Sequence, residues 1–187
     1  GKTMPQLHGD YRIVVARGLN SIREPDSLLD LILDKSIELL NAEAGSFLIV
    51  DQNTGELEFK LVRGPTGQSL LGTRLPLGAG VAGTVAQTGQ PAIVNKAQED
   101  PRWFSGVDSS TRFTTQSILS APLVHQNEVW GVLQIVNKRN KAPFNDMDLT
   151  LINTFAGQSV VAMDNARLLQ QTDQALQRRV HELAILQ

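Results

Sequence analysis

The chain of 187 residues contains no cysteine. This absence excludes disulfide bonds, a catalytic thiolate, zinc sites built on cysteine and pigments attached through a thioether. No apolar run approaches the ~20 residues that a membrane-spanning helix needs, and no signal-peptide pattern opens the chain. We therefore expect a soluble, cytoplasmic protein that has no membrane partner.

Charge and catalytic chemistry are also sparse. The formal net charge is −2 and no basic stripe is present, which argues against a nucleic-acid partner. No nucleophile stands beside a base, and no side chains have the spacing of a metal site. His8, His125 and His181 are isolated from one another, and none is placed to serve as an axial ligand of haem. The sequence thus predicts no catalytic residue, no metal and no enzyme.

The apolar segments that are present predict an α+β domain. Helical periodicity covers Tyr11–Ile22 and Asp26–Leu40. The predicted strands are Ser46–Val50, Glu56–Val62, Arg74–Leu77, Ala92–Val94, Ile118–Val124 and Val129–Val136, with a short helix at Val81–Gln87. This order predicts a central six-stranded, mostly antiparallel sheet with helices on one face. We expect the other face to be covered by the short helix and by a long polar loop at residues 95–115.

That loop is the main candidate for ligand binding. Its run Gly106–Thr115 is rich in small hydroxyl groups, with one carboxylate, and the aromatic Phe104 precedes it. Loops of this length inside a compact domain are usually functional or disordered. Such groups can grip a small polar molecule, so we expect the loop to act as the lid of a pocket.

From Asn145 onward the pattern is helical to the end of the chain. The residues that repeat at heptad spacing form two seams, Ala162, Leu169, Leu176 and Leu183 in one, and Ser159, Ala166, Asp173, Val180 and Gln187 in the other. A helix over the whole segment would span roughly 65 Å. We interpret it as a dimeric coiled-coil rod, the alternative being an ordinary C-terminal helix. Residues 1–9 are interpreted as a tag or disordered lead, 10–165 as a sensory domain, and 166–187 as a signalling helix that leads to an absent output module.

Two local patterns have simpler structural explanations. Gly78-Ala79-Gly80-Val81-Ala82-Gly83 matches a dinucleotide fingerprint, but Pro76 and the short helix do not fit a βαβ unit. We interpret it as a tight turn with close helix packing. Asn145 and Asp148 have the spacing of a capping box, and Phe144 and Leu149 that of a hydrophobic staple.

Several motifs together resemble the GAF family. They are Leu75-Pro76-Leu77-Gly78 with Gly80-Val81-Ala82-Gly83, Gln98-Glu99-Asp100-Pro101-Arg102, Ser117-Ile118-Leu119 with Pro122-Leu123, Gly131-Val132-Leu133 with Val136-Asn137-Lys138, and Asn165-Ala166-Arg167-Leu168. The nearest resemblance is to the cyclic-nucleotide-binding GAF domains of phosphodiesterases and bacterial adenylyl cyclases. Their signature falls on Asn137, Lys138, Phe144 and Asp148, with Leu149 where the family has Glu; we interpret these residues as holding the fold.

The resemblance implies a ligand pocket. Carried over by position, its residues are Ser46, Ala82, Phe104, Asp108, Thr111, Thr115 and Gln134. An aromatic face, hydroxyl groups and backbone N–H groups suit a purine cyclic nucleotide, cyclic AMP or cyclic GMP. Gln134 replaces an acidic residue common in the family, which can alter the base that is accepted.

The sequence therefore predicts a regulatory sensor domain of a signal-transduction protein. A small-molecule ligand would order the loop, and a homodimer formed through the N- and C-terminal helices would relay that state. One alternative is a ligandless dimerisation or scaffold module. Another is an enzyme similar to the GAF-like free methionine sulfoxide reductases, but those depend on cysteines that this chain lacks.

Overall fold

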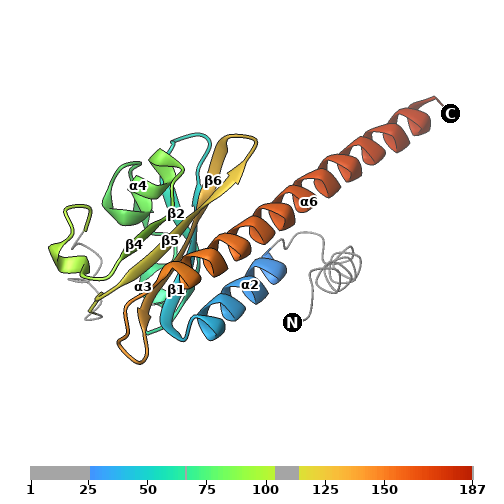
Figure 1. Ribbon diagram of the computed structural model, residues 1–187. Helices are drawn as coiled ribbons and strands as arrows, with labels where there is room; N and C mark the ends of the chain where they lie inside the picture. Colours follow the sequence, from blue (N-terminus) through green and yellow to red (C-terminus); the bar gives the residue numbers. More distant parts are fainter. Residues whose placement is uncertain (1–25, 66, 104–113, 187) are drawn as a thin grey trace. The chain divides into compact units, whose positions relative to one another are not determined.

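The computed structural model describes residues 26–65, 67–103 and 114–186 (Figure 1). The helices are α2 (Asp26–Leu39), α3 (Gly67–Leu70), α4 (Gly80–Thr88), the 3-10 turn η2 (Ala97–Glu99) and α6 (Asp146–Ile185). The strands are β1 (Ala42–Val50), β2 (Leu57–Arg63), β3 (Arg74–Leu75), β4 (Ala92–Val94), β5 (Ile118–His125) and β6 (Glu128–Lys138). The helix predicted at Tyr11–Ile22 lies outside the described residues. No helix in the described ranges is both long enough and apolar enough to cross a membrane.

The strands form one six-stranded sheet in the order β3-β2-β1-β6-β5-β4. Every neighbouring pair is antiparallel, which confirms the predicted α+β class. Two hairpins, β1–β2 and β5–β6, supply four of the six strands. Asp51 closes the β1–β2 turn, where its carboxylate accepts the Asn53 N–H at 2.8 Å, and the β5–β6 turn places Gln126 and Asn127 at positive φ. Asparagine tolerates this conformation better than most residues, which suits Asn127 to the turn. The turn lies between the two strands predicted at Ile118–Val124 and Val129–Val136.

One face of the sheet packs against α2 and the first turns of α6 (Figure 1). The inward side chains there are fully buried and include Phe47, Leu133 and Ile135. A Cβ atom on Gly45 would lie 2.9 Å from Ile135 Cδ1 and 3.0 Å from Ile37 Cγ1. Glycine at this position in β1 therefore allows α2 to approach the sheet.

The opposite face is covered by α4, as predicted for the short helix (Figure 1). Its apolar residues form a second buried cluster that includes Leu48, Phe59, Val85 and Val132. Because strand residues alternate between faces, Ala44, Ser46 and Leu48 of β1 all project to this side. The two cores are thus separated by the sheet.

The described chain divides into two compact units. Residues 30–160 form one of them, and this unit contains the whole sheet and α4. The last turns of α6, from Val161, belong to the other. The candidate site lies entirely within the first unit.

Candidate ligand pocket

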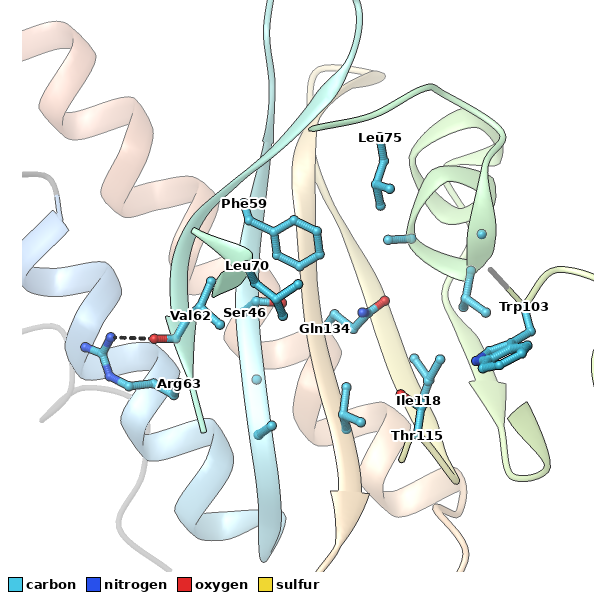
Figure 2. A pocket seen from close by; sticks show the side chains of 16 residues that line it. Ser46, Phe59, Val62, Arg63, Leu70, Leu75, Trp103, Thr115, Ile118 and Gln134 are labelled. Carbon is cyan, nitrogen blue, oxygen red and sulfur yellow. Dashed lines mark hydrogen bonds between the residues drawn. The ribbon is translucent and has the colours of Figure 1, made fainter. Parts of the chain in front are cut away.

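A pocket lies between the sheet and α4 (Figure 2). Its walls are mainly apolar and come from β2, α3, β3 and the start of α4, with Trp103 at one side. The lining side chains include Phe59, Val62, Leu70, Leu75, Val81 and Ile118. The cavity volume is about 90 Å³. This is room for a few waters or for one part of a larger ligand.

The floor of the pocket is polar. Ser46 of β1 and Gln134 of β6 are cross-strand partners, so their side chains project side by side from the sheet. Ser46 is only 4% exposed, and Thr115 contributes a third polar side chain close to the start of β5. Figure 2 shows the amide of Gln134 extending from β6 into the pocket. Its Oε1 atom is buried without a hydrogen-bond partner among the described residues.

Four of the seven residues predicted to contact a ligand meet in this pocket. Ser46, Ala82, Thr115 and Gln134 all line it. Phe104, Asp108 and Thr111 lie outside the described residues. The pocket also includes lining residues that the sequence did not suggest, namely Phe59, Leu70 and Trp103. Alternation along β2, where Leu57 and Phe59 are buried and Lys60 is exposed, is a signal that could have found Phe59. No local pattern indicates α3 or its Leu70.

The start of α4 forms one wall. Ala79, at the N-cap, makes no side-chain hydrogen bond to the helix, and Gly80, Val81 and Ala82 of the first turn line the pocket. The Gly78 N–H donates to the Gly83 carbonyl at 2.9 Å. A Cβ atom on Gly83 would lie 3.0 Å from the Pro76 carbonyl oxygen. These contacts confirm the tight turn, and a sheet that is antiparallel throughout its described strands leaves no βαβ unit for a dinucleotide.

Arg63 is the one charged residue among those that line the pocket in the described part of the chain. Its guanidinium turns away from the pocket toward α2 (Figure 2). There it donates to Asp34 at 2.9 Å and also to Asp30. Burial lowers the pKa of Arg63, but the hydrogen bonds to the two carboxylates outweigh it and raise the pKa above its usual value. The positive charge of Arg63 is therefore already paired with two carboxylates of α2. As a result, the pocket suits a neutral or singly charged ligand better than a multiply charged one.

Asn137 fixes the segment that carries Thr115. Its Oδ1 accepts the backbone N–H groups of Gln116 at 2.8 Å and Ser117 at 3.0 Å. Its Nδ2 donates to the Thr114 carbonyl at 2.9 Å and to Glu43 at 3.2 Å. One buried side chain therefore holds the chain on both sides of a pocket residue.

The other signature residues join β6 to α6. Lys138 and Asp148 form an ion pair at 2.8 Å, with both side chains mostly buried. Asp148 also accepts the Asn145 N–H at 2.9 Å, and Asn145 accepts the Asp148 N–H at 3.0 Å. The predicted capping box is thus present, and Phe144 beside it is buried. The staple between Phe144 and Leu149 stays a prediction.

A segment before the pocket is also clamped. Asn95, just after β4, accepts the Phe144 N–H at 2.8 Å and donates to the Phe144 carbonyl at 3.1 Å. Arg102 makes two hydrogen bonds to the carboxylate of Asp100, both at 2.9 Å. The hydrogen bond from Arg102 lowers the pKa of Asp100. The backbone of Trp103 bonds to the same Asp100, so this pair positions the indole at the pocket.

A family model of the GAF domain matches residues 23–164, which is most of the chain. The chain belongs to the GAF family. The resemblance drawn from the motifs is thereby confirmed. Over 169 residues the chain is 28% identical to the probable 3′,5′-cyclic phosphodiesterase pde-5 of Caenorhabditis elegans, covering 85% of this chain and 23% of that protein. The GAF chain spans less than a quarter of the length of the curated relatives it matches.

Solved structures share this GAF fold. The GAF domain from a phosphoenolpyruvate-protein phosphotransferase of Coxiella burnetii aligns with a TM-score of 0.70 at 21% identity, covering 85% of this chain and 94% of that one. The free methionine-R-sulfoxide reductase of Neisseria meningitidis aligns with a TM-score of 0.63 at 21% identity, covering 84% and 90%. The fold is thus also found in an enzyme, and the expectation that this GAF domain is not one stays a prediction.

Proposed function

We propose that this GAF domain is a regulatory sensor that binds a purine cyclic nucleotide. The observation that carries the proposal is the convergence of Ser46, Ala82, Thr115 and Gln134 on one pocket with apolar walls and a polar floor. Pockets with apolar walls and a few convergent polar groups are the usual form of small-molecule sites. The similarity to part of a cyclic phosphodiesterase supports a cyclic nucleotide as the ligand.

The chemistry of the walls fits such a ligand. Gln134 offers a hydrogen-bond donor and an acceptor to the edge of a base, and Trp103 and Phe59 offer aromatic surface. The N–H groups at the uncapped start of α4 can receive a phosphate that carries a single charge. Since Arg63 is already paired with α2, a ligand with a phosphomonoester dianion should bind more weakly than a cyclic one.

The walls must move apart to admit a whole nucleotide. The cavity of about 90 Å³ is smaller than the roughly 300 Å³ at the lower end of ordinary ligand sites. Binding would therefore shift the population toward a state in which the pocket is wider. The hydrogen bonds of Asn137 and the ion pair between Lys138 and Asp148 link the pocket to the first turn of α6, so a wider pocket would shift that turn.

The proposal predicts saturable binding of cyclic AMP or cyclic GMP to nucleotide-free protein. At a hundredfold excess over Kd, the bound nucleotide should stabilise the domain by about 2.7 kcal/mol. Calorimetric titration and thermal unfolding measure both effects, with AMP and GMP as controls that carry the additional phosphate charge. If neither cyclic nucleotide binds or raises the unfolding temperature, the ligandless scaffold becomes the better interpretation.

A further inference from the structure

A row of three polar residues crosses the central strands on the α4 face of the sheet. Ser46 of β1 is paired with Gln134 of β6, and Gln134 is in turn paired with Ser120 of β5. Residues directly opposite each other in an antiparallel sheet project to the same side. The row therefore begins at the pocket and ends one strand beyond it, because Ser120 is not among the residues that line the pocket.

Ser120 is unusual among the buried serines. It is 0% exposed, and its Oγ has no hydrogen-bond partner among the described residues. Ser36 and Ser159 are equally buried, but each donates to a carbonyl four residues earlier in its helix, both at 2.7 Å. The partnerless atom of Ser120 lies on the strand beside Gln134, whose Oε1 is partnerless too. Buried polar atoms almost always have partners, so a neighbouring pair without them calls for an explanation.

Access to Ser120 from the pocket requires a movement of α4. On the β4 side its cross-strand partner is Ala92, and α4 packs over β5 and β6 on this face. The buried side of α4 carries the small residues Ala82, Gly83 and Ala86 together with Val81 and Val85. The helix begins at Gly80, which like Gly78 has a positive φ, and it has no side-chain cap. A shift of α4 would thus extend the pocket from Gln134 to Ser120.

We propose that Ser120 and Gln134 form an inner subsite that binds the amino group of the ligand. This inference rests on the proposed function and deepens it. The amide oxygen of Gln134 can only accept, and the hydroxyl of its cross-strand partner Ser120 can accept as well as donate, so the pair offers two acceptors on one face of the sheet. An exocyclic –NH₂ on a planar base supplies two N–H donors, which matches them. A carbonyl or phosphate oxygen placed against Gln134 Oε1 would meet its lone pairs and gain no hydrogen bond from that atom.

Two matched pairs of cyclic nucleotides test the inference. Cyclic AMP differs from purine riboside 3′,5′-cyclic monophosphate only by an amino group, and cyclic GMP differs from cyclic IMP in the same way. In the unmodified protein the amino-bearing member of at least one pair should bind about tenfold more tightly. Ser120→Ala should reduce that ratio severalfold, whereas Ser159→Ala, on the other face of the sheet, should leave it unchanged.

The free protein offers an independent measurement. Removal of a partnerless buried hydroxyl should leave the unfolding temperature of Ser120→Ala equal to or above that of the unmodified protein. This result would also establish that the variant folds.

Equal binding within both pairs, or a ratio that Ser120→Ala leaves intact, would overturn the inner subsite while leaving the proposed function in place. A lower unfolding temperature for Ser120→Ala would likewise show that the hydroxyl already has a partner, against the proposal. If none of the four nucleotides binds, the proposed function fails and the subsite fails with it.

Discussion

The side chain of Asn137 connects three segments at the end of β6. It accepts two backbone N–H groups and donates to the Thr114 carbonyl and to Glu43. Its own backbone has a φ of 58°, a conformation that asparagine tolerates better than most residues. Side chain and backbone conformation therefore both favour asparagine here, and the segment that it holds carries a pocket residue, Thr115.

We predict that Asn137→Ala lowers the free energy of unfolding by about 2–4 kcal/mol, because it strands the buried N–H group of Ser117, the partly buried N–H group of Gln116 and the Thr114 carbonyl. Urea unfolding measures this loss. Asn140→Ala is the control, since Asn140 accepts one exposed N–H, from Ala142, at 3.0 Å. That variant should lose less than about 1 kcal/mol. If the two variants unfold at the same urea concentration, Asn137 does not have the structural role described here.

At the scale of elements, the placement of α4 depends on Gly83. We predict that Gly83→Ala destabilises the domain by about 1–3 kcal/mol, because its Cβ would press on the Pro76 carbonyl and on the turn at Gly78. If the domain binds a cyclic nucleotide as proposed, the added methyl group should also weaken that binding, since α4 forms a wall of the pocket. Thermal unfolding and calorimetry measure the two effects.

Gly157 provides the matched control in α6. A Cβ atom there would meet nothing within 4 Å. Alanine is the better helix former, so Gly157→Ala should stabilise the protein by up to about 1 kcal/mol. Opposite signs for the two substitutions are the expected outcome, and stabilisation by both would contradict the close packing at Gly83.

Apolar periodicity in the sequence predicted the existence of most helices and strands. It was wrong about strand ends that are set by pairing with distant parts of the chain. Strand β1 begins at Ala42, four residues before the predicted start at Ser46. Alanine and glycine have low strand propensity, and this extension forms because Ala42 and Ala44 pair with Lys138 and Val136 of β6. Strand β3 stops at Leu75, two residues early, because Pro76 has no N–H to donate to the ladder. The short α3 has no sequence signal that we recognised.

At the scale of the whole molecule, the family resemblance indicated the polar residues of the pocket but not the apolar walls of the pocket. Ser46 and Gln134 were inferred by carrying the family's pocket over by position, and the sheet register then brings them together. Leu70 joins the pocket only because α3 packs beside β2, which no local pattern reveals. The inner position of Ser120 depends on the register of three strands, so it too required the structure.

Dimerisation belongs to this same scale and is our remaining prediction. In the last turns of α6, Leu176 and Leu183 of the leucine seam are 61% and 57% exposed, and Val180 of the second seam is 59% exposed. If two copies pair along this seam, Leu176→Asp should shift the protein to monomer in sedimentation velocity. Gln174→Asp adds the same charge away from the seam and should not. A chain that ends at Ala162 and dimerises as tightly as the full chain would exclude the seam as the main interface.

The strand order carries a consequence for synthesis on the ribosome. Strand β1 can form a hairpin with β2 as soon as both have been made, but its other edge belongs to β6, which begins only at Glu128. The centre of the sheet therefore cannot close until nearly the whole domain has left the exit tunnel. Until then the apolar residues of β1 have one open edge, and non-local pairing of this kind folds slowly. We expect the nascent chain to be most prone to aggregation during this interval.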